Sequence, residues 1–340
     1  MAGKKIGVRD KTFDVVKFIA MFMVVYWHVM SYRPRFELSS RPSYAANFII
    51  AVNMPLFFTV SGFFSQHLHE SGNWAKLAAR LKLYFWPVVV FSLVFAIVES
   101  IFYRNYAFVA VPLLWLKKFL FCHWFFYALA ACDAITFMAF KFGRTPMRII
   151  LFCIVAFGLC VIVSGKIWYS VRVVAMAPFY WFGLVGLRRI LEMRHVSTTL
   201  SVLGGAVMFF ATFLAGNIAS NGLAFYWDSV DVWHLQFVKV LNMLARFIVG
   251  TLGSIAIIVA VRFSCRRFRL VGLFSDLGEE TLGIYFLQGA MISWISNRFV
   301  KLDAGVLTVF LASCGIFALC FLMVRVLKMS NFVKKGIFGK

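Results

Sequence analysis

The sequence predicts an all-α, polytopic integral membrane protein. Of its 340 residues, 62% are hydrophobic and only 14% are charged, and the mean hydropathy is +0.87. A water-soluble globule needs more polar surface than this composition supplies. The apolar residues lie in long runs, and about 20 of them in a helix are enough to cross the hydrocarbon core of a bilayer. We therefore expect about ten transmembrane helices.

Ten runs are long and apolar enough to be predicted as membrane spans. No soluble domain is evident between them, so residues 1–340 are predicted to form a single transmembrane domain with short basic tails at 1–12 and 327–340. The stretch 219–240 is consistent with a re-entrant or interfacial segment. The predicted spans are approximately 14–32, 45–67, 83–102, 119–140, 147–164, 172–188, 199–217, 246–262, 280–297 and 304–325.

The basic residues predict the orientation of the chain. The formal net charge is +22, and the 35 Lys and Arg lie mostly in short clusters between the apolar runs. If the amino terminus is cytoplasmic, 22 of these bases fall in cytoplasmic segments and 12 in outer ones. The positive-inside rule therefore favours cytoplasmic amino and carboxyl termini. Clusters of this kind meet anionic lipid headgroups, and their distribution argues against nucleic acid as a partner.

Two ionisable residues in the first span are candidates for function. Lys17 and His28 are eleven residues apart, which is three helical turns, or about 16 Å along one face. A cation near the cytoplasmic side can hold a phosphate, and a histidine nearer the outer side can accept a proton. The structural alternative is that Lys17 snorkels to the headgroups while His28 bonds a neighbouring helix.

Further polar candidates lie in and beside the second and third spans. Ser61 and Gly62, in MPLFFTVSGFF, allow close helix packing and also place a hydroxyl in the membrane interior. Arg80 and Lys82 lie in the predicted cytoplasmic turn KLAARLKLYFWP, ahead of Pro87. These two bases could bind phosphates or simply mark the cytoplasmic side.

The fourth span begins with FCHWFFYALAACD. His123 and Trp124 are predicted near the outer face, level with His28, so the two histidines could line one cavity; Trp124 could instead belong to the interfacial aromatic belt. Asp133 lies deeper and requires a cationic or hydrogen-bonding partner that the sequence does not identify.

Metal binding is disfavoured. Asp228, Asp231 and His234 have a spacing that could place three ligands on one helical face, but this pattern is weak evidence. The seven cysteines show no metal-type C-x-x-C spacing and no disulfide framework, and are best explained as small buried hydrophobes. No metal is therefore predicted.

Together these segments resemble the acyltransferase type 3 family of bacterial membrane enzymes, which O-acylate surface and exported carbohydrates. The family's pattern of a basic residue, ten residues and a histidine corresponds to Lys17 and His28. MPLFFTVSGFF, RLKLYFWP, HWFF and LGEETLGIYFLQ are similar to its later motifs, in the same order. Two positions depart from the family pattern: Lys17 stands where Arg is usual, and Gln288 stands where His is frequent.

The resemblance implies an O-acyltransferase, an O-acetyltransferase in particular, in the bacterial inner (plasma) membrane. Acetyl-CoA or another acyl-CoA would be the cytoplasmic donor, and a hydroxyl of a surface polysaccharide or lipid-linked saccharide would be the acceptor. His28 would be the catalytic base, and Lys17, Arg80 and Lys82 would hold the CoA phosphates. Residues of the substrate pocket would be Ser61, His123 and Trp124.

Two other function classes remain open from the sequence. A transporter or flippase for a lipid-linked or anionic solute could use the same intramembrane Lys and His, but should show Gly- and Pro-interrupted helices in matched halves of the chain. The chain has only seven prolines and no matched halves are evident. A non-catalytic assembly or scaffold protein would be favoured by loss of the histidine, and His28 is present.

Overall fold

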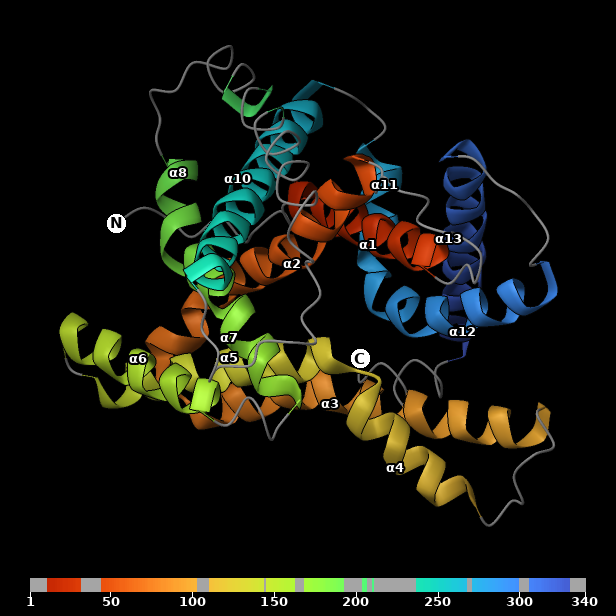
Figure 1. The fold of residues 1–340 in the computed structure, drawn as a ribbon, viewed down its shortest axis with the longest axis horizontal. Helices are drawn as coiled ribbons and strands as arrows, with labels where there is room; N and C mark the ends of the chain where they lie inside the picture. Colours follow the sequence, from red (N-terminus) through yellow and green to blue (C-terminus); the bar gives the residue numbers. More distant parts are fainter. Residues whose placement is uncertain are drawn as a thin grey trace. The chain divides into compact units, whose positions relative to one another are not determined.

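The described part of the chain is entirely helical, as predicted. The computed structural model describes residues 11–31, 44–102, 110–143, 145–162, 168–192, 204–206, 210, 237–267, 271–299 and 306–330. Within these residues every regular element is a helix (Figure 1). In lipid a helix satisfies its own backbone hydrogen bonds, which is why apolar runs of this length adopt it.

The helices follow one another with short connections where these are described. The elements are α1 (Lys11–Ser31), α2 (Tyr44–Ser71), α3 (Trp74–Phe102), α4 (Val111–Phe121), α5 (Trp124–Phe142), α6 (Pro146–Ile162), α7 (Trp168–Trp181), the π-helix η2 (Phe182–Leu187), α8 (Arg188–Glu192), α10 (Phe237–Arg267), α11 (Val271–Glu279), α12 (Thr281–Phe299) and α13 (Val306–Met329).

Seven helices among the described residues are long and apolar enough to cross a membrane, and two shorter apolar segments, 147–156 and 281–292, accompany them. The chain is therefore a polytopic membrane protein. Most of the predicted span 199–217, and most of the stretch 219–240, lie outside the described residues. The total of ten spans and the cytoplasmic location of both termini stay predictions.

The start of the third span was placed wrongly. The basic segment before residue 83 is not a turn, because α3 already begins at Trp74 and carries Arg80 and Lys82 on its first turns. The only connection to α2 is the pair Gly72 and Asn73, with Gly72 at a φ of 56°. Ala, Leu, Lys and Arg are good helix formers, so the segment continues the helix even though its charge lowers the hydropathy.

The described helices form two compact units. The first unit holds α1, α11 and α12, with the parts of α2 up to Phe57, of α10 from Ile248 and of α13 up to Val324. The second unit holds α3 to α8 and η2, with the part of α2 from Phe58 and the part of α10 up to Phe247. The single transmembrane domain stays a prediction.

The core of the first unit forms around α1. A Cβ atom on Gly278 of α11 would lie 1.8 Å from the carbonyl oxygen of Asp14, so the two helix backbones touch at this point. Phe18 packs against Phe274 of α11 and Phe317 of α13, with both pairs of ring centroids 5.2 Å apart. Figure 1 shows α1, in red, beside α11 and α13. This packing fixes the helix that carries both Lys17 and His28.

In the second unit, α2 and α7 cross through a reciprocal pair of glycines. A Cβ on Gly62 would lie 1.9 Å from the carbonyl oxygen of Tyr180, and a Cβ on Gly183 would lie 1.9 Å from that of Thr59. Small residues that let backbones approach are a common means of helix association in membranes. Gly183 belongs to η2, so the π-helical turn begins at the crossing.

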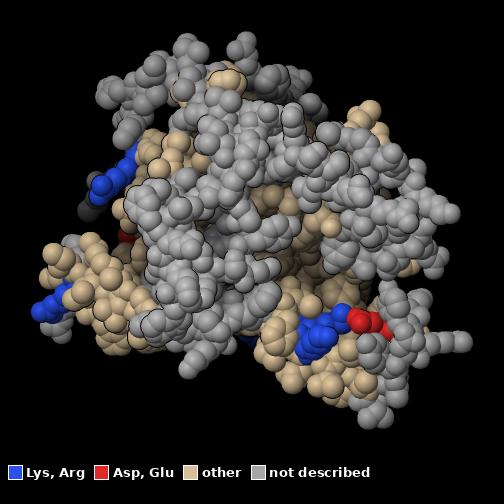
Figure 2. Space-filling view, in the orientation of Figure 1, with Lys and Arg blue, Asp and Glu red and all other residues tan. Residues whose placement is uncertain are grey.

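The helix α4 was not predicted, and the fourth span does not begin at 119. The apolar run is interrupted at Cys122 and His123, which separate α4 from α5. Hydropathy does not detect this break because the residues on both sides are apolar. A salt bridge of 2.5 Å between Lys118 and Glu99 joins α4 to α3, and Figure 2 shows basic and acidic side chains adjoining at this hairpin.

The glycine crossing makes a prediction about stability. Gly183→Ala should lower the melting temperature of the purified protein markedly, because the added methyl group meets a backbone carbonyl that cannot rotate away; overpacking of this kind costs about 1–3 kcal/mol or more. Thermal unfolding in detergent, followed by size-exclusion chromatography, measures the effect.

Gly158→Ala is the matched control, because no heavy atom lies within 4 Å of a Cβ built there. Equal melting temperatures for the two variants would show that the α2–α7 crossing is not as close as described.

Candidate functional site

His28 forms a hydrogen bond with Gln288, the residue that stands where the family frequently has a histidine. Its Nδ1 lies 2.8 Å from Oε1 of Gln288, which is buried on α12 in the same unit. An amide oxygen only accepts hydrogen bonds, so Nδ1 of the imidazole carries the proton and donates. The other ring nitrogen, Nε2, then keeps its lone pair. The pairing defines both the tautomer and the orientation of the ring.

Lys17 lies on the same helix, as predicted, and is part of an ion pair. Its Nζ is 3.2 Å from Oδ1 of Asp14, one turn earlier on α1, and the Asp14 side chain is almost fully buried. About a third of the Lys17 side chain remains exposed. The Lys17 side chain is therefore partly accessible, and the Asp14 carboxylate lies on one side of its ammonium.

The buried partner that Asp133 requires is Arg80. Arg80 Nε donates to Asp133 Oδ2 at 2.7 Å, and the Tyr84 hydroxyl donates to the same oxygen at 2.8 Å. The Asp133 side chain has no exposed surface, whereas that of Arg80 is 22% exposed. A second guanidinium nitrogen of Arg80, Nη2, donates to the backbone carbonyl of Ser61 at 3.3 Å. Helices α2, α3 and α5 are thus joined around one charge pair.

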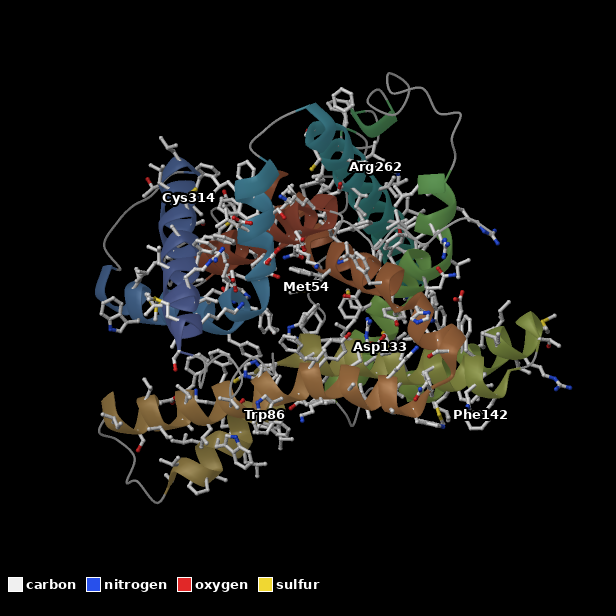
Figure 3. All side chains as sticks on the ribbon, turned by 180° about the vertical axis from the view of Figure 1, so that it is seen from behind. Met54, Trp86, Asp133, Phe142, Arg262 and Cys314 are labelled. Atoms are coloured by element: carbon white, nitrogen blue, oxygen red, sulfur yellow. The ribbon has the colours of Figure 1, made fainter. Side chains whose placement is uncertain are left out.

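The other oxygen of Asp133 extends the network to α7. Oδ1 accepts a hydrogen bond from the Tyr180 hydroxyl, and Nε2 of His69 lies 2.7 Å from that hydroxyl. Because the hydroxyl donates to Asp133, the histidine nitrogen is assigned as the donor to the tyrosine oxygen. Figure 3 labels Asp133 on α5, in the interior of the second unit. A carboxylate with three donors is well compensated for its loss of water.

The remaining predicted site residues lie elsewhere in the second unit. Lys82 is exposed on α3. His123 is buried and precedes α5, and burial lowers its pKa to about 4, with the charge of Lys118 contributing in the same direction. Its imidazole is therefore neutral at physiological pH. Trp124 stacks beneath the guanidinium of Arg172, 4.6 Å from the ring centroid.

The structure brings some of the predicted residues together. Ser61 and Arg80 are in contact, but through the serine carbonyl and not through its hydroxyl. Lys17 and His28 share α1 in the first unit, whereas His123 and Trp124 belong to the second. A common cavity for His28 and His123 therefore stays a prediction. The weak metal candidates Asp228, Asp231 and His234 lie outside the described residues.

Sequence reasoning missed five contributors to these sites, namely Gln288 as a partner of His28, and Asp14, His69, Tyr84 and Tyr180. Gln288 was noticed only as a departure, although a polar residue in an apolar span needs a partner, and that rule applied equally to His28. Tyr84 and Tyr180 were not singled out among the eleven tyrosines of the chain. Their hydroxyls were the available signal, since a buried hydroxyl requires a hydrogen-bonding partner.

Comparison with known protein families identifies a match over most of the chain. The family described as "Acyltransferase domain", type 3, matches residues 10–325, which is nearly the whole chain. No curated protein and no solved structure matches. The match gives no support to the transporter or flippase alternative.

The Arg80–Asp133 pair makes a prediction about stability. Arg80→Met should destabilise the protein by about 3–5 kcal/mol, because it leaves a buried carboxylate without its cation. The double variant Arg80→Met with Asp133→Leu should recover much of that loss, since it removes the orphaned charge as well. Urea- or heat-induced unfolding of the purified variants in detergent measures both.

The single and double variants must be compared under the same conditions. If the double variant is less stable than Arg80→Met alone, Asp133 does not depend on Arg80 for its compensation.

Proposed function

Because this chain belongs to the acyltransferase type 3 family, we propose that it is an O-acyltransferase, and an O-acetyltransferase in particular, of the bacterial inner membrane. It moves the acyl group of cytoplasmic acetyl-CoA, or another acyl-CoA, to a hydroxyl of a surface polysaccharide or lipid-linked saccharide presented from the outer side. The apolar helices and the family match support a multi-pass membrane protein of an acyltransferase family.

One observation carries the assignment of the catalytic base. The hydrogen bond of 2.8 Å between His28 Nδ1 and Gln288 Oε1 leaves Nε2 unprotonated and holds the ring in a defined orientation. A general base must present a lone pair at a fixed position within hydrogen-bonding reach of the proton that it removes. Since α1 packs against α11 and α13, the helix that carries the base is held in place before the substrate binds.

The proposed reaction is a single displacement at the thioester carbon. His28 Nε2 takes the proton from the acceptor hydroxyl while the hydroxyl oxygen forms a bond to the acyl carbon. The carbon–sulfur bond then breaks, and CoA leaves with a proton as the free thiol. In the alternative, an acyl group is first carried by the enzyme and then passed to the hydroxyl, with the same net balance.

The donor is proposed to bind through its phosphates. The side chains of Lys17 and Arg80 are partly exposed, and Lys82 is exposed. Lysine and arginine are the usual partners of phosphate groups. Ser61, His123 and Trp124 are proposed as pocket residues for the substrates; for the last two this agrees with their expected location near the outer face, where the acceptor is presented.

The test is transfer of label from radiolabelled acetyl-CoA into surface glycan, with membranes that contain matched amounts of protein. His28→Ala should reduce transfer by about 10²–10⁴-fold, the usual contribution of general acid–base catalysis. Lys17→Ala should mainly raise the KM for acetyl-CoA. Gln288→Leu should retain part of the activity, because it removes the orientation of the ring but not the ring itself.

His67→Ala is the matched control, because His67 is an exposed histidine on α2 and should leave transfer unchanged. If His28→Ala labels glycan as well as the native protein does, histidine-based catalysis is wrong. If the native protein labels nothing with acetyl-CoA or with longer acyl-CoA donors, the proposed activity is wrong.

A further inference from the structure

Asp133 binds Arg80 on one edge of the guanidinium only. The contact is made by Nε, which lies 2.7 Å from the carboxylate and 2.8 Å from the Tyr84 hydroxyl. Nη2 has one contact, with the carbonyl of Ser61 at 3.3 Å. Among the residues that the structure describes, none accepts a hydrogen bond from Nη1. The Arg80 side chain is 22% exposed, and its guanidinium therefore keeps N–H groups that no described residue accepts.

The carboxylate is itself immobilised from the opposite side. The Tyr180 hydroxyl donates to Oδ1, and His69 donates to that hydroxyl. Both side chains are buried, and His69 Nε2 lies 4.0 Å from the same carboxylate oxygen. Tyr180 also stands at the α2–α7 crossing, where its backbone carbonyl touches Gly62. The position of Asp133 is consequently fixed by helices that cannot shift easily.

Stability alone does not explain why a buried ion pair of this kind is present. Desolvation of two charges often exceeds their attraction, and a well-packed apolar pair of the same volume is frequently as stable. In a purely structural pair the N–H donors of the arginine are used, whereas among the described residues Arg80 Nη1 has no acceptor. The arrangement is typical of a side chain that is held in one orientation so that it can bind a ligand.

We propose that Asp133, supported by Tyr84 and Tyr180, is a positioning residue that holds Arg80 with its free N–H groups directed at a phosphate of the acyl-CoA donor. This inference rests on the proposed function for the identity of the donor. Asp133 touches no substrate and acts only through Arg80. It stabilises the arginine rotamer before binding, so less conformational entropy is lost when the phosphate arrives.

The experiment measures the binding of CoA, not its turnover, by equilibrium dialysis with purified protein in detergent. Asp133→Asn should weaken CoA binding about tenfold, because the amide no longer holds the guanidinium by a charge-assisted bond. Binding of pantetheine, which lacks all the phosphates of CoA, should be the same in the native and variant proteins. A loss of phosphate contact would weaken the binding of CoA but not that of pantetheine, whereas general damage to the fold would weaken the binding of both.

Thr136→Val is the matched control. Thr136 is buried one turn from Asp133 on α5, and its Oγ1 accepts a hydrogen bond of 3.0 Å from Trp181 Nε1 of α7, so this variant also removes a buried interhelical bond. It should leave CoA binding unchanged. If Asp133→Asn does not fold, Tyr180→Phe takes its place, and a weakening of about threefold is expected because the carboxylate loses one of its three donors.

Each outcome decides the inference. It is overturned if folded Asp133→Asn, or Tyr180→Phe in its place, binds CoA as the native protein does, if Thr136→Val weakens CoA equally, or if the native protein does not bind CoA. A protein that binds CoA in a manner dependent on Asp133 but transfers no acyl group would retain the positioning role and contradict the proposed activity.

Discussion

A single carboxylate organises the second unit. Asp133 has no exposed surface, and a charge in that environment is tolerated only with a cation and several hydrogen bonds around it. Its partners come from α3 and α7, and Arg80 reaches on to the backbone of α2. Four helices must therefore keep one relative arrangement, since a shift of any of them would leave the charge without compensation.

Features that depend on local sequence patterns could be predicted from the sequence. Lys17 and His28 lie on one helix, so their spacing in the sequence was enough to predict their relative positions. Both residues lie on α1. The family followed from motifs in their order and is confirmed. These predictions needed only local periodicity or linear pattern, which a sequence displays directly.

The partners across helices could not be predicted in this way. Asp133 and Arg80 are 53 residues apart, and His28 and Gln288 are 260 apart. Which residues face each other depends on the rotation and depth of each helix, and hydropathy is nearly uniform around a span of this kind. For the same reason the break at His123 and the short helix α4 were missed, since an interruption within apolar sequence leaves no trace in composition.

The glycine crossing has a consequence for motion. With a backbone carbonyl in contact at Gly62 and another at Gly183, α2 and α7 cannot slide past each other, because a register shift would bring a larger residue against a carbonyl oxygen. The two helices must therefore move as one rigid body. Any rearrangement of the second unit during a working cycle would have to occur where other helices meet this pair, with the α2–α7 crossing serving as its fixed frame.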